Sequence, residues 1–174
     1  MLPLAVFFWM MIGAVVVFSR DAGQRSLRGL GIVITIWGAL AARAFGAPAP
    51  FPMQLAGAAV CVVAFVIYQW AALSIRGRTF SYAGNTDLPE FVHQSGPYAS
   101  IRNPFYLSYL LTAASTVIMW PTRWGIAVLI FAVIYFQWLV RFEEGKFERS
   151  AVAADYAQYK ARTGRFLPPL LRRR

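Results

Sequence analysis

Charged side chains are scarce in this sequence. Only 14% of its 174 residues are charged and 59% are hydrophobic, whereas ordinary soluble domains are about 25% charged and about 45–50% apolar. A soluble fold of this size has too little interior to bury so much apolar surface, so the excess must face lipid. Intrinsic disorder is excluded as well, because disordered chains are poor in hydrophobic residues. The composition predicts an integral membrane protein.

Cysteine and histidine occur once each, as Cys61 and His93. A lone cysteine excludes a scaffold of intramolecular disulfides. One cysteine with one histidine cannot build a typical zinc site, so we expect no metal centre. The sequence contains neither a Gly-x-Ser-x-Gly motif nor a Walker-type phosphate loop. Its nearest glycine-rich stretch, Gly29-Leu30-Gly31, opens an apolar run with no predicted strand before it, which argues against a Rossmann-type nucleotide loop.

The apolar residues are gathered in five runs separated by polar segments. Each run approaches the length of about 20 residues that a helix needs to cross a bilayer. The first run could instead be a secretory signal peptide, but it lacks a basic start and a small-residue cleavage site. The last two runs are joined by three residues and therefore predict an antiparallel helical hairpin. The runs comprise residues 2–18, 30–45, 51–75, 105–120 and 124–140.

These runs predict one all-α membrane domain with five transmembrane helices. All but two of the 17 basic residues, Arg43 and Arg123, fall on one side of this topology. The positive-inside rule makes that side the cytoplasm, so the long loop and the C-terminal tail are predicted to be cytoplasmic. The same rule accounts for the net charge of +10, so we expect contact with membrane lipids and no nucleic-acid partner. The predicted domain, residues 1–174, consists of three spans in 1–75, the loop 76–104, the hairpin 105–140 and the tail 141–174.

The polar loop ends in a motif that leads into the fourth apolar run. It reads Gly-Pro-Tyr-Ala-Ser-Ile-Arg-Asn-Pro-Phe-Tyr over residues 96–106. Proline is favoured in the first turn of a helix, so Pro104 marks a helix start. Arg102 and Asn103 then lie at the N-terminal end of that helix, where the dipole and unpaired N–H groups favour anions. Composition alone favours an interfacial anchor with an N-cap; the alternative is an anion-binding turn.

Two adjacent glutamates, Glu143 and Glu144, follow the fifth apolar run. Membrane anchoring requires basic residues rather than carboxylates, and ionisable groups at membrane depth are costly and usually functional. Neighbouring helical residues are about 100° apart, so one glutamate can face the bundle while the other faces solvent. The alternative is a solvated charged turn, with Glu144 and Glu148 outside any site.

The order and spacing of these motifs resemble the isoprenylcysteine carboxyl methyltransferase family, which is related to the phospholipid N-methyltransferases. The shared pattern is Gly-Pro-Tyr-x-x-x-Arg-Asn-Pro-x-Tyr, a tight helical hairpin, Glu-Glu, and a terminal Tyr-x-x-Tyr-x-x-Arg-x-x-Arg-Phe-Leu-Pro. It covers residues 90–169, the C-terminal half of the chain. The family usually has histidine where Asn103 stands, and asparagine keeps a donor and an acceptor but cannot titrate.

The resemblance implies a membrane-embedded methyltransferase that uses S-adenosyl-L-methionine without a soluble Rossmann domain. It implies that the cofactor is enclosed by the Arg-Asn-Pro turn, the hairpin and the tail. A glutamate suits the α-ammonium of the cofactor, and an arginine can hold a carboxylate bidentately. The residues implied as catalytic are Arg102, Glu143 and Glu144, and those implied as cofactor-binding are Tyr98, Asn103, Pro104, Tyr106, Glu143, Glu144 and Arg165.

The chemistry of the acceptor separates two enzymatic possibilities. A carboxylate is already ionised at neutral pH and needs no general base, whereas an amine must first lose a proton. The candidate bases are few, namely Glu143, Glu144 and His93. This shortage favours isoprenylcysteine-type carboxyl O-methylation of a lipophilic or prenylated acceptor that enters from the bilayer. The alternatives are phospholipid N-methylation and a non-catalytic relative that binds a lipid or a protein partner.

Overall fold

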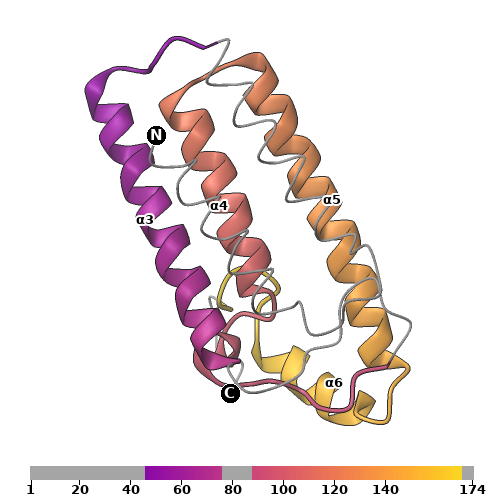
Figure 1. The fold of residues 1–174 in the computed structure, drawn as a ribbon. Coiled ribbons are helices and arrows are strands. Elements are labelled where there is room, and N and C mark those ends of the chain that lie inside the picture. Colours follow the sequence, from indigo (N-terminus) through magenta and orange to yellow (C-terminus); the bar gives the residue numbers. More distant parts are fainter. Residues whose placement is uncertain (1–45, 76–87, 170–174) are drawn as a thin grey trace, which may run out of the picture.

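The computed structural model describes residues 46–75 and 88–169, and this part of the chain is helical (Figure 1). Within it there is no β-strand, as the all-α prediction requires. The predicted spans 2–18 and 30–45 lie outside the described residues, as does part of the long loop. The elements are α3 (Phe51–Ser74), the short 3-10 helix η1 (Gly96–Ala99), α4 (Pro104–Met119), α5 (Arg123–Glu148) and α6 (Ala153–Arg162).

The helices α3, α4 and α5 run in alternating directions, and α6 lies at the end of the bundle where α5 finishes (Figure 1). At the opposite end, the backbone N–H of Ala49 donates to the carbonyl of Met119 at 2.9 Å, which joins the start of α3 to the end of α4. The hydroxyl of Thr122 accepts from the N–H of Gly125 at 3.0 Å and so caps the start of α5. The predicted helical hairpin is therefore present, and α4 begins at Pro104 as expected.

Small residues bring α3 and α4 close together. Gly57, Cys61 and Ala64 recur on one face of α3 and are buried. Small side chains allow two helix backbones to approach each other, which stabilises helix pairs in membranes. The approach is tight at Gly57, where an added Cβ would lie 2.4 Å from the Cγ of Met119 and 3.0 Å from the carbonyl oxygen of Ser115.

Aromatic rings connect α3, α4 and α5 at the end of the bundle where α4 begins. Tyr68 of α3 is buried, and its ring centroid lies 5.2 Å from that of Phe105 and 6.1 Å from that of Tyr109. Phe136 of α5, also buried, stacks on Tyr106 at 5.2 Å and on Tyr109 at 5.9 Å. The three helices therefore share one core beside α6.

The polar side chains inside α4 are satisfied by their own helix. The hydroxyls of Ser108, Thr112, Ser115 and Thr116 are buried, and each donates to a backbone carbonyl about one turn earlier at 2.6–3.1 Å. A buried hydroxyl without such a partner would be costly. These bonds allow a polar stripe to lie in an apolar bundle.

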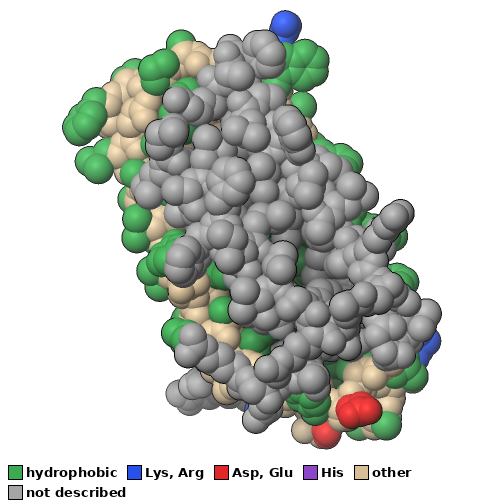
Figure 2. Space-filling model, in the orientation of Figure 1, with side chains coloured by type: hydrophobic (Ala, Val, Ile, Leu, Met, Phe, Trp, Pro, Cys, Tyr) green, Lys and Arg blue, Asp and Glu red, His purple; other side chains and the backbone are tan. Residues whose placement is uncertain are grey.

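The outer faces of α3 and α5 are apolar. Both helices are long and apolar enough to cross a membrane, with 24 and 26 residues. Figure 2 shows hydrophobic side chains along the edge formed by α3 and acidic side chains at the end near α6. The exposed residues include Leu55, Val62, Val66, Trp70, Ile126, Ile130, Ile134 and Trp138. These faces support a membrane protein, while the count of five spans and the cytoplasmic orientation remain predictions.

The helix α5 continues eight residues beyond the end of the predicted span at Val140, as far as Glu148. The apolar run ends at Val140, but helical hydrogen bonding does not depend on hydropathy. The extension is held by side-chain contacts that hydropathy does not report. Glu143 and Glu144 are therefore helical residues, as their predicted angular offset requires.

The close approach at Gly57 predicts an asymmetry between two glycines. Gly57→Ala should lower the midpoint of thermal unfolding in detergent, because overpacking a tight contact costs about 1–3 kcal/mol, more than alanine's gain in helix propensity of about 1 kcal/mol. Gly145→Ala is the matched control, since a Cβ there meets nothing within 4 Å; its midpoint should stay level or rise. Equal midpoints for the two variants would contradict the packing described here.

Candidate active site

The Gly-Pro-Tyr motif forms a tight turn against the end of α3. Gly96 has φ +62°, a conformation that glycine adopts readily. An added Cβ there would lie 2.6 Å from the Cβ of Ser74. Pro97 and Tyr98 are buried in the 3-10 turn that follows. Glycine is therefore required at this position, both because φ is positive and because a side chain would collide with Ser74. The turn places residues 100–103 at the start of α4.

The C-terminal segment lies alongside this turn. Ile101 and Gly164 form an isolated parallel bridge, in which the N–H of Gly164 donates to Ser100 at 3.0 Å and the N–H of Arg102 donates to Gly164 at 2.9 Å. Gly164 has no room for a side chain, because a Cβ would lie 1.6 Å from the carbonyl oxygen of Leu167. Two segments more than sixty residues apart in sequence are thus fixed side by side.

Asn103 extends the same pairing. Its backbone N–H and its side-chain Nδ2 both donate to the carbonyl oxygen of Arg165, each at 3.2 Å. Asn103 occupies the N-cap position of α4, but its side chain does not cap the helix. Its amide instead fixes the backbone that carries Arg165.

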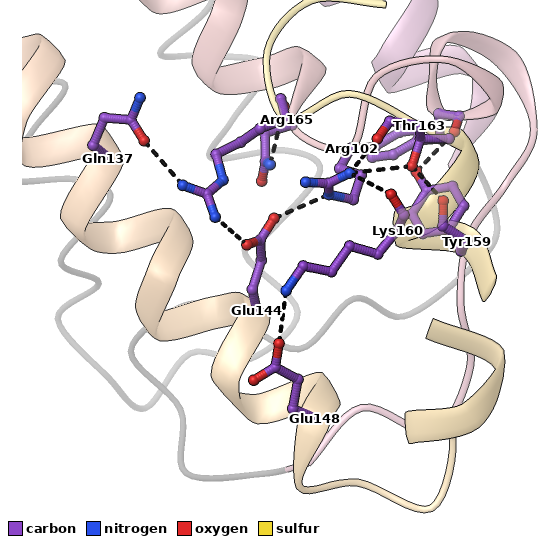
Figure 3. Close-up of polar contacts among 10 residues, drawn as sticks. Arg102, Gln137, Glu144, Glu148, Tyr159, Lys160, Thr163 and Arg165 are labelled. Carbon is purple, nitrogen blue, oxygen red and sulfur yellow. Dashed lines mark hydrogen bonds and ion pairs between the residues drawn. The ribbon is translucent and has the colours of Figure 1, made fainter. Parts of the chain in front are cut away.

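Glu144 lies between two arginines at the centre of the candidate site (Figure 3). Its Oε1 accepts from Nε of Arg102 at 3.0 Å, and its Oε2 accepts from Nη2 of Arg165 at 2.6 Å. Glu144 is only 5% exposed. Because both of its carboxylate oxygens are engaged by guanidinium groups, the reading of Glu144 as part of a solvated turn was wrong. The three charged groups together carry one net positive charge.

Arg102 also holds the C-terminal end of α6. Its Nη1 donates to the carbonyl oxygens of Lys160, at 3.2 Å, and of Thr163. A cation beside the carbonyls at a helix C-terminus is favoured by the helix dipole. Arg102 therefore joins the turn before α4, the end of α5 and the end of α6.

Glu143 has a different environment from its neighbour. It is partly exposed, and its Oε1 accepts from the phenol of Tyr106 at 2.8 Å. Tyr106 is itself held by stacking on Phe136. Glu143 thus keeps access to solvent or a ligand, whereas Glu144 does not.

Tyr98 and Pro104 lie around the charged cluster rather than in it. The backbone carbonyl of Tyr98 accepts a hydrogen bond from the phenol of Tyr159 at 2.7 Å. The ring of Tyr98 packs edge to face against the ring of His93, with 4.9 Å between the centroids. Burial raises the pKa of Tyr159 to about 12, against the opposing effects of nearby arginines, so its phenol remains a donor at neutral pH. Pro104 is buried as the first residue of α4.

The structure adds residues that the sequence reasoning missed. Gln137 accepts from Nη1 of Arg165 at 3.3 Å. It lies two helical turns before Glu144, and a polar residue inside an apolar run was the signal that could have identified it. Tyr156 is buried against Phe147, and burial together with the charge of Glu144 raises the pKa of its phenol. Tyr156 is the first tyrosine of the terminal Tyr-x-x-Tyr motif, but it was not among the residues implied as catalytic or cofactor-binding.

Comparison with known proteins bears on this arrangement. Residues 53–152 match the family model for phospholipid methyltransferase. The chain belongs to the phospholipid methyltransferase family. No curated protein sequence matches it. The match spans α3, α4 and α5 with both glutamates, and it supports a membrane methyltransferase of a kind that generally uses S-adenosylmethionine. The resemblance inferred from the motifs is confirmed at the level of this family.

The burial of Glu144 predicts that its charge holds the tail in place. Glu144→Gln should lower the free energy of unfolding by about 3 kcal/mol, the low end for a broken buried ion pair because Arg165 is partly exposed. It should also speed tryptic cleavage after Lys160 and Arg162. Glu148→Gln is the control: its bond to Lys160 is exposed, so the change should stay below about 1 kcal/mol. Equal effects of the two variants on the free energy of unfolding would contradict the claim that the buried charge of Glu144 holds the C-terminal segment in place.

Proposed function

We propose that this protein transfers a methyl group from S-adenosyl-L-methionine to a lipophilic acceptor in the membrane. The observation that carries the proposal is the group of Arg102, Glu144 and Arg165 beside Glu143, at one end of an apolar bundle from this methyltransferase family. In the topology predicted from the basic residues, this end faces the cytoplasm, where a water-soluble cofactor is available.

The charged side chains of the site match the two charged groups of the cofactor's amino-acid part, its α-ammonium and its carboxylate. An ammonium beside Glu144 would meet two guanidinium groups, so that carboxylate is a poor partner for it. Glu143 is partly exposed and accepts a hydrogen bond from the neutral phenol of Tyr106, so its carboxylate suits an ammonium. The net positive charge around Glu144 suits a carboxylate instead. We therefore assign Glu143 to the α-ammonium, and Arg102 and Arg165 to the carboxylate.

The protein's part in the reaction is alignment and exclusion of water. When bound, the cofactor supplies a methyl group whose bond to sulfur breaks as a bond to the acceptor forms, with the electron pair remaining on sulfur. Arg102 and Arg165 are fixed by Glu144, and Glu143 by Tyr106, so the site holds its charges in place before any ligand arrives. Fixed orientation of the reacting groups, with exclusion of water once the ligands are bound, supplies much of the rate of such a displacement.

The surroundings of the candidate bases favour a carboxylate acceptor. Glu144 is committed to two arginines, and the ring of His93 is buried between Ser95 and Tyr98. Only Glu143 is left to deprotonate an amine, and it is the residue assigned to the cofactor. A carboxylate needs no such base, so isoprenylcysteine-type carboxyl O-methylation of a lipophilic or prenylated acceptor is our leading assignment.

Phospholipid N-methylation is the second candidate, and the family match is equally consistent with it. Product analysis separates the two. After incubation with membranes and methyl-labelled S-adenosylmethionine, a methyl ester releases its label in base as volatile methanol, whereas the label of an N-methylated phospholipid stays on the amine headgroup and is not volatile. A non-catalytic relative that binds a lipid or protein partner would give neither product.

Binding of S-adenosylhomocysteine tests the cofactor site directly. Titration calorimetry of the detergent-purified protein should give micromolar affinity, about −8 kcal/mol. The double variant Glu143→Ala/Glu144→Ala should lose it, because the ammonium loses its partner and the arginines lose their anchor. Glu148→Ala should bind like wild type. Absence of binding by well-folded wild-type protein would refute a cofactor-dependent enzyme and support the non-catalytic relative.

Asn103 provides a second test of the site. Asn103→His should keep or raise activity, because an imidazole N–H can replace the amide as the donor to the carbonyl of Arg165. Asn103→Leu removes that donor with little change in size and should lower activity. Methyl transfer into the lipid fraction is the measurement. A clear loss in the histidine variant would show that this turn is wrongly aligned with the family motif.

A further inference from the structure

Gln137 is a polar residue within the apolar part of α5. It lies seven residues before Glu144, about 10 Å along the helix axis, and so faces the same side of α5. Its side-chain oxygen accepts from Nη1 of Arg165 at 3.3 Å. Figure 3 shows the guanidinium of Arg165 held between Gln137 on one side and Glu144 on the other.

This arrangement fixes the plane of the guanidinium group. Glu144 binds Nη2 at 2.6 Å and Gln137 binds Nη1, so two partners on one helix set its orientation. The side chain of Arg165 is still 30% exposed, against 9% for Arg102. Arg165 is therefore the more accessible of the two guanidiniums. An amide satisfies one of its donors without adding negative charge, whereas a second glutamate would cancel the net positive charge of the cluster.

We propose that Gln137 is a positioning residue, which orients Arg165 to receive the carboxylate of the methyl donor and of its product. This inference rests on the proposed function and deepens it, since it states that Gln137 and Arg165 recognise the carboxylate of the ligand. Gln137 acts only through Arg165. Its loss therefore weakens ligands that carry a carboxylate and leaves the remaining contacts intact.

The test is calorimetric and uses two ligands with the full-length protein in detergent. Gln137→Met keeps the size of the side chain but removes the acceptor. It should weaken binding of S-adenosylhomocysteine about tenfold, the effect expected for one hydrogen bond to a charged group. It should leave unchanged the weaker binding of the decarboxylated analogue, which has the amine but no carboxylate. In an Arg165→Met background, Gln137→Met should have no further effect.

Gln54→Met is the matched control, because Gln54 also lies in an apolar helix but bonds to Ala49 at the other end of the bundle. It should bind both ligands like wild type. If Gln137→Met leaves S-adenosylhomocysteine binding unchanged, or weakens both ligands equally, the positioning role is refuted while the methyltransferase proposal stands. If folded wild-type protein binds neither ligand, the proposed function and this inference fail together.

Discussion

The buried carboxylate of Glu144 is the constraint on which the rest of the candidate site depends. A buried charge is tolerated only when it is paired and hydrogen-bonded. Glu144 meets that requirement with Arg102 from the turn before α4 and Arg165 from the C-terminal segment. Neither arginine is near Glu144 in sequence. One ion-pair cluster therefore brings three distant parts of the chain to the same end of the bundle and gives that end a net positive charge.

The bundle supports this cluster by being rigid where the charges lie. Stacked rings of Tyr106, Tyr109 and Phe136 join α4 to α5 next to the two glutamates. Gly57 and its small neighbours hold α3 against α4 farther along. Side-chain rotamers in such a core are fixed by packing. The site is therefore built on helices, which hold charged groups more precisely than a mobile loop would.

Sequence reasoning succeeded where the signal was local. The length of the apolar runs predicted α3 and the hairpin, and the preference of proline for a first turn placed the start of α4 at Pro104. It could not reach features that tertiary contacts decide. Hydropathy stopped the fifth run at Val140, while α5 continues to Glu148. The angular offset of adjacent helical residues predicted that Glu143 and Glu144 would differ, but only the positions of the arginines show which one is enclosed.

The parallel bridge between Ile101 and Gly164 also joins an early part of the site to a late one. During synthesis the turn and the helical hairpin are made before the segment that carries Arg165. Until that segment docks, Glu144 lacks one of its two arginines. A chain that stops after α5 would lack Arg165 and therefore the completed charge cluster. The charge cluster is therefore complete only when three segments that are far apart in sequence have met, so its ion pairs depend on the folding of this whole end of the bundle.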